Sequence, residues 1–392
     1  MHVCHLVQNC AGGAPRIADF LVTAQSKAGY QVSVIILRER NPEWNIFKDA
    51  NSVDVLNIET TNLKLLGSNL AGQVYSEALR TIKLKDALLK LKPDIIVAHT
   101  TNVARTLYMA SLIPGMPRIP YIAYIHSDLE SEVRANLKLN WGPLVKLALQ
   151  FSIRALSQAA GLVFVCHSLQ KRLTQLGLVH RNSIVAYNPF APSAPQVGSE
   201  TPLHPVAEGW LQDLERVTFV SAARFDPQKD HKTLLKAFAQ VIQTYPNARL
   251  ILLGDGPLFE QSKDLANTLN LQEEVLFAGH VSNARDYFRR CRALVLCSHW
   301  EGLPLVLVEA ISSGVTFIAS DCPTGPREIS EIFECGTLFP PGDSKALAAA
   351  FKDHLKSSTP VALNAEQIDL FAPQTCVNKL DSLLTSVLEM TC

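Results

Sequence analysis

The feature that most limits the fold of this chain is a regular alternation between short apolar runs and longer amphipathic segments. The run HVCHLV at residues 2–7 is followed by a helical pattern from Pro15 to Ala28 and then by QVSVIIL at residues 31–37. Apolar runs of this length between helical segments are typical of parallel βαβ units. Further strands are predicted in the first half at residues 95–99, 121–126, 161–165 and 183–188.

The alternation pauses near the middle of the chain and then starts again. Residues 189–205 are rich in Pro, Ser, Ala and Gly and show little periodicity, which is the composition of a linker. After them, VTFVSAAR opens a second series of strands that are continuously apolar, as strands covered on both faces are. We therefore predict an α/β chain with two doubly wound, Rossmann-like domains. The predicted limits are 1–190 for the first domain, 191–213 for the linker, 214–372 for the second domain and 373–392 for a final helix that packs back toward the first.

Composition narrows the possible partners and the compartment. Lys+Arg and Asp+Glu each number 36 in 392 residues, so no basic excess indicates a nucleic-acid partner. The nine cysteines are scattered without a C-x-x-C pair, which favours reduced thiols over disulfides or a metal site. The N-terminus lacks the features of a signal peptide, and no apolar run reaches the length of about 18 residues that a spanning helix needs. These features predict a cytoplasmic protein that lies on a membrane at most.

Glycine-rich turns directly after predicted strands are the first candidates for a ligand site. In doubly wound sheets, ligands bind outside the carboxyl ends of the strands. Gly12 and Gly13 follow the first strand and precede Pro15, a turn where backbone and helix N-terminus can approach a phosphate. An ordinary strand-to-helix turn explains this pair equally well. The turn GDGP, which begins at Gly254, is weak on its own for the same reason.

Two cations follow the first strand of the second domain. Arg224 ends VTFVSAAR, and Lys229 comes five residues later across a turn that contains a proline. The donor fork of an arginine and the point charge of a lysine at one strand end suit a diphosphate. A solvated charged loop is the alternative.

The most informative segment is SHWEGLPLVLVE at residues 298–309. Glu301 lies in the predicted loop and Glu309 lies one to two turns into the helix that follows, so both side chains can face one site. Carboxylates accept hydrogen bonds from neighbouring hydroxyls, as on a hexose or a ribose. The amides of Leu305 and Val306 in the first helical turn are left for a phosphate.

Together these motifs resemble the retaining glycosyltransferase family 4, whose GT-B fold has two Rossmann-like domains facing a central cleft. The likeness is carried by ARFDPQKDHKTLLKAF, LILLGDGPL, VLFAGHV, SHWEGLPLVLVEAISSG and IASDCPTGPREI, in the order and spacing of that family. Over residues 1–190 only NCAGG and YIAYIH fit clearly. Two positions depart from the family pattern. Pro15 stands where the family often has Glu, a difference that concerns the contacts with the acceptor, and Ala223 stands where Gly is common.

The resemblance implies a role for each motif. It assigns the donor-sugar hydroxyls to Glu301, the ribose diol to Glu309, and the diphosphate to Arg224 with Lys229. His126, which ends YIAYIH, would face the reacting sugar, although a single histidine at a strand end is more often structural. The other donor-binding candidates are Gly13, Gly254, Gly279, His280, Val281, Gly302, Leu305, Val306 and Thr324.

The function implied by the resemblance is transfer of a hexose or N-acetylhexosamine from a UDP-sugar to an acceptor hydroxyl, with retention of configuration. The expected acceptor is a lipid-linked saccharide used in polysaccharide or glycan assembly. No Asp-x-Asp triplet is present to hold a metal on the diphosphate, so we expect no metal cofactor. A non-hydrolysing UDP-sugar epimerase of the same fold and a non-enzymatic sugar-nucleotide sensor are the alternatives.

One segment of the first half suggests contact with a membrane. Residues 134–154 combine basic side chains with Trp141 and several leucines. The basic residues are Arg134, Lys138, Lys146 and Arg154. Such a segment suits the anionic inner face of the cell membrane. A helix packed on the first sheet with exposed basic residues explains the same composition equally well.

Overall fold

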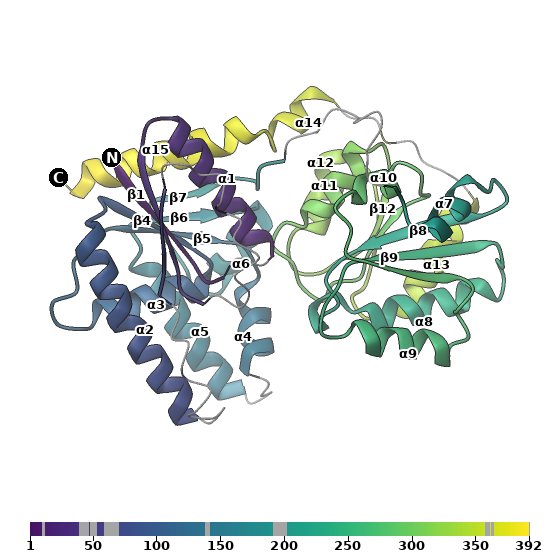
Figure 1. Cartoon of the computed structure of the whole chain (residues 1–392), viewed down its shortest axis with the longest axis horizontal. Coiled ribbons are helices and arrows are strands. Elements are labelled where there is room, and N and C mark those ends of the chain that lie inside the picture. Colours follow the sequence, from purple (N-terminus) through teal and green to yellow (C-terminus); the bar gives the residue numbers. More distant parts are fainter. Residues whose placement is uncertain are drawn as a thin grey trace. The chain divides into compact units, whose positions relative to one another are not determined.

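The computed structural model forms two compact units, each built around one parallel sheet (Figure 1). The first unit comprises Met1–Pro189 and Pro373–Cys392, and the second comprises Phe190–Ala372. The structure describes residues 1–9, 12–38, 47, 53–58, 70–137, 142–190, 202–356, 361 and 364–391. Most of the predicted linker therefore lies outside the described residues.

The first unit is built on a seven-stranded sheet in the order β3-β2-β1-β4-β5-β6-β7. Every neighbouring pair in it is parallel. The strands are β1 His2–Val7, β2 Gln31–Ile36, β3 Asp54–Asn57, β4 Ile95–His99, β5 Tyr121–Ile125, β6 Gly161–Phe164 and β7 Ser183–Val185. All residues of β1, β4, β5 and β6 are buried, as expected for strands covered by helices on both faces.

Helices cover both faces of this sheet. They are α1 Gly13–Lys27, α2 Leu70–Leu91, α3 Thr101–Ser111, α4 Leu129–Leu137, α5 Gly142–Ser157, α6 His167–Gln175 and α15 Pro373–Thr391. Helices α1 and α15 pack together on one face, while α2, α3 and α5 lie on the other (Figure 1). The final helix α15 packs on β6 because Cys376, Leu380, Leu384 and Val387 form a buried apolar stripe along it.

The second unit has a six-stranded parallel sheet in the order β10-β9-β8-β11-β12-β13. Its strands are β8 Val217–Ala222, β9 Ala248–Leu253, β10 Val275–Gly279, β11 Leu294–Leu296, β12 Phe317–Ser320 and β13 Thr337–Phe339. Its helices are α7 Pro205–Gln212, α8 His231–Ile242, α9 Phe259–Thr268, α10 Ala284–Phe288, α11 Leu305–Ser312, α12 Pro326–Phe333, α13 Ser344–Lys356 and α14 Ala365–Asp369, with a short 3₁₀ helix η4 at Pro227–Lys229.

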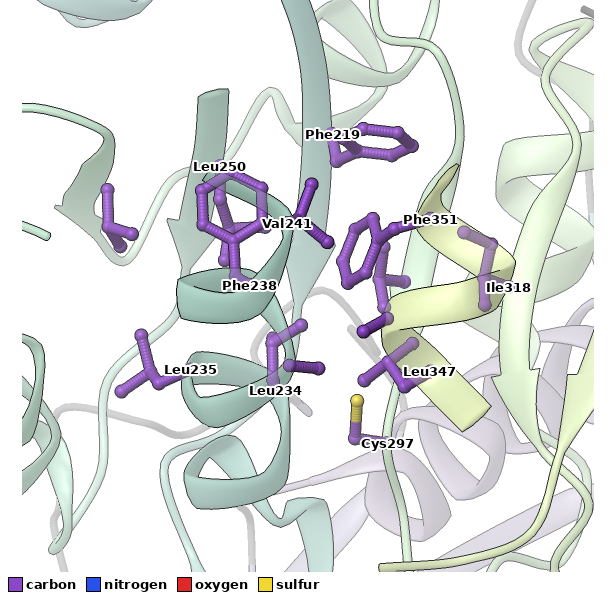
Figure 2. Packing of buried hydrophobic residues seen from close by; sticks show 14 of the residues in the cluster. Phe219, Leu234, Leu235, Phe238, Val241, Leu250, Cys297, Ile318, Leu347 and Phe351 are labelled. Carbon is purple, nitrogen blue, oxygen red and sulfur yellow. The ribbon is translucent and has the colours of Figure 1, made fainter. Parts of the chain in front are cut away.

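The largest described apolar cluster of the second unit lies between its sheet and helices α8 and α13. Figure 2 shows Phe238 of α8 and Phe351 of α13 facing one another beside Phe219 of β8. The ring of Phe351 meets Phe219 edge to face, with 4.7 Å between the ring centroids. Edge-to-face contacts of this kind add to the burial of apolar area, so they fix α8 and α13 against the strands that carry the candidate site.

Both sheets confirm the prediction of two Rossmann-like α/β domains, and each contains a point where the strand order reverses. In the first sheet this point lies between β1 and β4, and in the second it lies between β8 and β11. Helices that follow the two strands leave toward opposite faces, so a crevice opens at their carboxyl ends where ligands commonly bind. The short strands β3 and β13 were not predicted; their segments DVLN and TLF contain only two apolar residues each.

Candidate active site

The loop after β8 carries Lys229 in a fixed backbone conformation. The Asp226 carboxylate accepts a hydrogen bond from the backbone amide of Lys229 at 3.3 Å and caps the 3₁₀ helix η4. Asp230 has a left-handed backbone conformation, with φ of 44°, and its carboxylate accepts from the Thr233 amide at 3.1 Å as the N-cap of α8. Lys229 therefore lies between two capping carboxylates that set where its side chain starts.

Lys229 forms an ion pair with Glu301, which lies in the loop after β11. The same carboxylate oxygen, Oε1, accepts a hydrogen bond from the Ser298 hydroxyl at 2.6 Å. The two side chains of the pair are 20% and 9% exposed, so the pair is partly withdrawn from water and is screened less than a surface pair. Because β8 and β11 are the neighbours at which the strand order reverses, the pair lies at the switch point of the second sheet.

Hydrogen bonds that involve backbone atoms tie these two loops together. The His299 amide donates to the Gln228 carbonyl at 2.8 Å, and the Gln228 side-chain amide donates to the Trp300 carbonyl at 2.7 Å. A further contact joins His299 Nε2 to the Asp230 carboxylate at 3.3 Å. The position of Glu301 relative to Lys229 is thus set by the loops as well as by the ion pair.

The loop after β12 supports Glu301 from the other side. Thr324 is 1% exposed, and its hydroxyl donates to the Glu301 carbonyl. Gly325 has φ of 94°, and a Cβ there would lie 2.6 Å from Pro304 Cδ and would also collide with the Gly302 carbonyl. The Thr324 hydroxyl therefore helps to hold the Glu301 backbone in place, and the donor contact predicted for Thr324 stays a prediction.

Helix α11 begins at Leu305, beside these loops. Its N-cap residue, Pro304, makes no side-chain capping hydrogen bond. The amides of Leu305 and Val306 lie in its first turn, where helix amides have no intrahelical acceptor. Glu309 lies one turn further along, and its side chain is half-buried. This placement agrees with the predicted helix start and leaves both amides at the edge of the site.

The remaining candidates in the second unit lie in the loops after β8, β9 and β10. Gly254 has φ of 131°, and a Cβ there would collide with the Ala223 carbonyl just before Arg224. The Gly254 amide also donates to the Gly279 carbonyl at 2.7 Å, which joins the loops after β9 and β10. Arg224 is exposed. The next residues after β10 are His280, which is exposed, and Val281, which is half-buried.

Two further titratable groups near this site are uncharged at neutral pH. Burial, together with the nearby Glu301 carboxylate, raises the pKa of the Cys322 thiol to about 12. Burial lowers the pKa of His231 to about 4, and its ring stacks on Phe225 with 3.9 Å between the centroids. A neutral thiol is a weak nucleophile, so Cys322 is poorly suited to covalent catalysis.

In the first unit, His126 follows β5 and is held by stacking. Its ring is parallel to that of Tyr124 at 4.6 Å between centroids, and burial lowers its pKa to about 3. Its Nε2 atom is buried and has no hydrogen-bond partner among the residues that the structure describes. At the end of β1, the positive φ falls on Gly12, whereas Gly13 is exposed as the first residue of α1. A Cβ on Gly13 would meet nothing within 4 Å among the described residues.

A buried polar network beside His126 was missed at the sequence level. His5 Nδ1 lies 2.9 Å from His99 Nε2, and His5 Nε2 lies 2.8 Å from Gln25 Oε1. The Gln25 amide donates in turn to Asp381 of α15 at 3.0 Å. The sequence offered one sign of this network: polar histidines occur in two otherwise apolar strands, His5 in HVCHLV and His99 at the end of IIVAH. Only the fold shows that the two meet, because β1 and β4 are far apart in the chain.

The described residues contain neither a metal-binding cluster nor a membrane-spanning helix. No group of three or more His, Cys, Asp or Glu residues in the described ranges is arranged to hold a metal ion. Within the same ranges, no helix combines the length and the apolar character needed to cross a bilayer.

Comparison with known families gives two matches in tandem. Residues 11–193 match the family described as Glycosyltransferase Family 4, and residues 208–368 match Glycosyl transferases group 1. An uncharacterized glycosyltransferase of Methanocaldococcus jannaschii is 28% identical over 64% of this chain and 61% of its own length. The lipopolysaccharide 1,6-galactosyltransferase of Escherichia coli is 33% identical over 33% of this chain and 37% of its own length.

A third relative transfers N-acetylgalactosamine to a diphospho-undecaprenol-linked saccharide in Campylobacter jejuni, and it is 28% identical over 35% of this chain and 37% of its own length. The chain thus spans about three fifths of the first of these relatives and less of the others.

Two solved structures resemble the fold along almost the whole chain. Anabaena HepE, in complex with UDP and glucose, superposes with a TM-score of 0.74 at 20% identity, over 98% of this chain and 99% of that one. The apo form of the lipopolysaccharide outer core galactosyltransferase WaaB gives 0.69 at 18% identity, over 98% and 99% of the two chains. These likenesses show the GT-B type of fold. With both family matches in order along the sequence, the chain belongs to the glycosyltransferases of family 4 and group 1.

Proposed function

We propose that this protein is an enzyme that transfers a hexose or N-acetylhexosamine from a UDP-sugar to a hydroxyl of a saccharide acceptor. The observation that supports this most is the Lys229–Glu301 ion pair at the switch point of the second sheet. It offers a cation for a phosphate and a carboxylate for sugar hydroxyls within one small site. A structural neighbour that binds UDP and glucose favours the same class of donor.

The proposed chemistry relies on charge stabilisation and orientation. In the transfer, a bond forms between the acceptor oxygen and the anomeric carbon, while the bond from that carbon to the diphosphate oxygen breaks. Lys229, Arg224 and the first amides of α11 would bind the negative charge that grows on the leaving UDP. These groups support turnover without a metal, which activity in excess EDTA would test.

Retention of configuration is part of the proposal. With Cys322 uncharged, no thiolate at this site is set up to form a covalent intermediate. We infer attack on the same face that the diphosphate leaves, with a donor phosphate oxygen taking the acceptor proton. Proton NMR of the product should show an α-linkage from an α-configured donor, and a β-linkage would contradict this step.

We further propose that the acceptor is a lipid-linked saccharide reached at the inner face of the cell membrane. Helix α5 exposes Lys146, Leu147 and Phe151, with Leu147 62% exposed, and Leu112, directly after neighbouring α3, is 67% exposed. Apolar and basic side chains on neighbouring helices suit an anionic interface. Lys138 and Trp141, which belong to the same predicted segment, lie outside the described residues. Sedimentation with anionic but not with neutral liposomes would support the proposal, and no sedimentation with either would contradict it.

The central experiment is a panel of nucleotide sugars followed by product analysis. Thermal shifts should be largest with one UDP-sugar and smaller with the GDP- and ADP-sugars. Mass spectrometry should then show one sugar added to a lipid-linked saccharide acceptor and release of UDP. If no nucleotide sugar stabilises the protein and no acceptor gains mass, the proposed activity is wrong.

The two alternatives give different results in the same experiment. A non-hydrolysing epimerase would convert UDP-N-acetylglucosamine to its epimer without any acceptor. A sensor would bind the nucleotide sugar and leave it unchanged with every acceptor. The Lys229–Glu301 pair beside the open start of α11 favours transfer, because these groups can stabilise a departing diphosphate.

A further inference from the structure

Ser298 is buried directly beneath the Glu301 carboxylate. Its side chain is 0% exposed, and its hydroxyl donates to Glu301 Oε1 at 2.6 Å. Lys229 Nζ contacts the same oxygen. The second oxygen, Oε2, has no hydrogen-bond partner within the described part of the chain. The carboxylate therefore has one occupied oxygen and one that is left to accept a hydrogen bond from a ligand.

The backbone around this contact is held by the neighbouring strand. The Ser320 hydroxyl at the end of β12 donates to the Ser298 carbonyl at 2.5 Å. The Thr324 hydroxyl donates to the Glu301 carbonyl. Both ends of the Ser298–Glu301 turn are thus fixed by buried hydroxyls, so the Ser298 side chain starts from a defined position. The backbone hydrogen bonds do not fix the last side-chain torsion of Glu301, because the χ3 torsion of a glutamate has a broad range of allowed values.

Lys229 alone is a weak restraint on the carboxylate. An ammonium group on a flexible four-carbon stem contacts an oxygen from many directions, whereas a buried hydroxyl two residues beyond a strand has few rotamers. A hydrogen bond to a charged acceptor is also stronger than one between neutral groups. The Ser298 hydroxyl is therefore the contact that can set the rotation of the carboxylate plane.

We propose that Ser298 is a positioning residue for the donor sugar. It fixes the Glu301 carboxylate with Oε1 toward Lys229 and Oε2 toward a hydroxyl of the sugar. This inference rests on the proposed function, because it requires a sugar hydroxyl as the partner of Oε2. It assigns no contact between Ser298 and the nucleotide, so the loss of Ser298 should affect the recognition of the sugar and not that of UDP.

The test compares binding of UDP with binding of UDP-glucose, UDP-galactose and UDP-N-acetylglucosamine by calorimetry. Ser298→Ala removes the hydroxyl, and Ser298→Cys replaces it with a somewhat larger thiol that is a weaker donor. We expect the variants to bind the preferred UDP-sugar about tenfold more weakly than the wild type. Their affinity for UDP should change less than twofold. The matched control is Ser262→Ala, which removes a buried hydroxyl of the same unit that donates to the Leu258 carbonyl at 2.7 Å.

A crystal structure of Ser298→Ala separates this inference from the proposed function. If the wild type binds none of the UDP-sugars, the proposed donor class is wrong, yet the structure still shows whether Ser298 holds the carboxylate. We expect the Glu301 carboxylate to rotate or to lose its single conformation in the variant. The inference is overturned if the carboxylate stays in place, or if binding of UDP and of UDP-sugar weakens by the same factor.

Discussion

At the scale of single residues, the candidate site contains charged groups that differ in their burial. Lys229 and Glu301 form an ion pair in a partly buried place, whereas Arg224 is exposed to water. A cation held in a fixed position costs little reorganisation when negative charge grows on a leaving group. We therefore expect Lys229 to contribute more to the chemical step than Arg224.

Replacing Lys229 by alanine should mainly slow the reaction. The variant loses the preorganised cation at the diphosphate, so kcat should fall by about 10²- to 10³-fold, while the KM for the donor changes less. Steady-state kinetics with the preferred UDP-sugar measure both constants. Lys232→Ala is the matched control, because Lys232 is an exposed lysine in the first turn of α8. Equal effects of the two substitutions would show that Lys229 acts only through the overall charge of the surface.

At the scale of elements, the site is assembled from loops that approach one another closely. Strands β8, β9, β11 and β12 each end in such a loop, and the loops are joined by hydrogen bonds between their backbones and buried hydroxyls. Gly254 and Gly325 lie where two loop backbones are so close that a Cβ would collide with a carbonyl of the neighbouring loop. A side chain at either position would have to displace backbone, which cannot give way as a flexible side chain can.

Replacing Gly254 by alanine should destabilise the second unit. The residue has φ of 131°, and its Cβ would collide with the Ala223 carbonyl, so both backbone strain and overlap contribute. We expect a loss of about 2–5 kcal/mol in the free energy of unfolding, measured by urea denaturation. Gly314→Ala is the control, since Gly314 has φ of 79° but open space around it. Its loss should be only about 1–2 kcal/mol, and an equal loss in both variants would argue against the overlap.

At the scale of the whole molecule, the two units differ in how many buried histidines they contain. Burial lowers the pKa of His2, His5, His99 and His126 in the first unit and of His231 and His354 in the second. Each of these histidines is protonated more readily in the unfolded chain than in the folded one. Their contribution to stability is therefore complete above the unfolded pKa of about 6.5 and is lost as the pH falls below it.

Acidification should therefore destabilise the first unit before the second. Between pH 6.5 and pH 5, each histidine that stays neutral in the fold should cost about 1.4 kcal/mol of stability per pH unit. Hydrogen exchange at pH 7 and pH 5.5, corrected for intrinsic rates, should show a larger loss of protection in β4 than in β9. Burial raises the pKa values of Asp381 and Glu132 in the first unit, which acts in the opposite direction to the histidines as the pH falls. Equal losses in both strands would contradict the prediction.

The sequence by itself determined the fold class and most of the groups of the candidate site. Apolar runs separated by helical segments predict parallel sheets, because buried strands and amphipathic helices leave different periodicities in the chain. The charged and glycine residues that follow these runs identified Lys229, Glu301 and Gly254, since ligand sites form at strand ends. The short edge strands β3 and β13 were missed, since DVLN and TLF contain only two apolar residues each.

Only the tertiary structure decided which of these residues meet and what each one does. Strand order brings Lys229 and Glu301 together across 72 positions of sequence, and it brings His5 to His99 across 94. It also shows that the Thr324 hydroxyl donates to the Glu301 carbonyl, and that the Ser298 and Ser320 hydroxyls form further hydrogen bonds in the same loop. The physical reason is that hydrogen-bond partners depend on the order and register of strands, and a local pattern of residues does not specify either one.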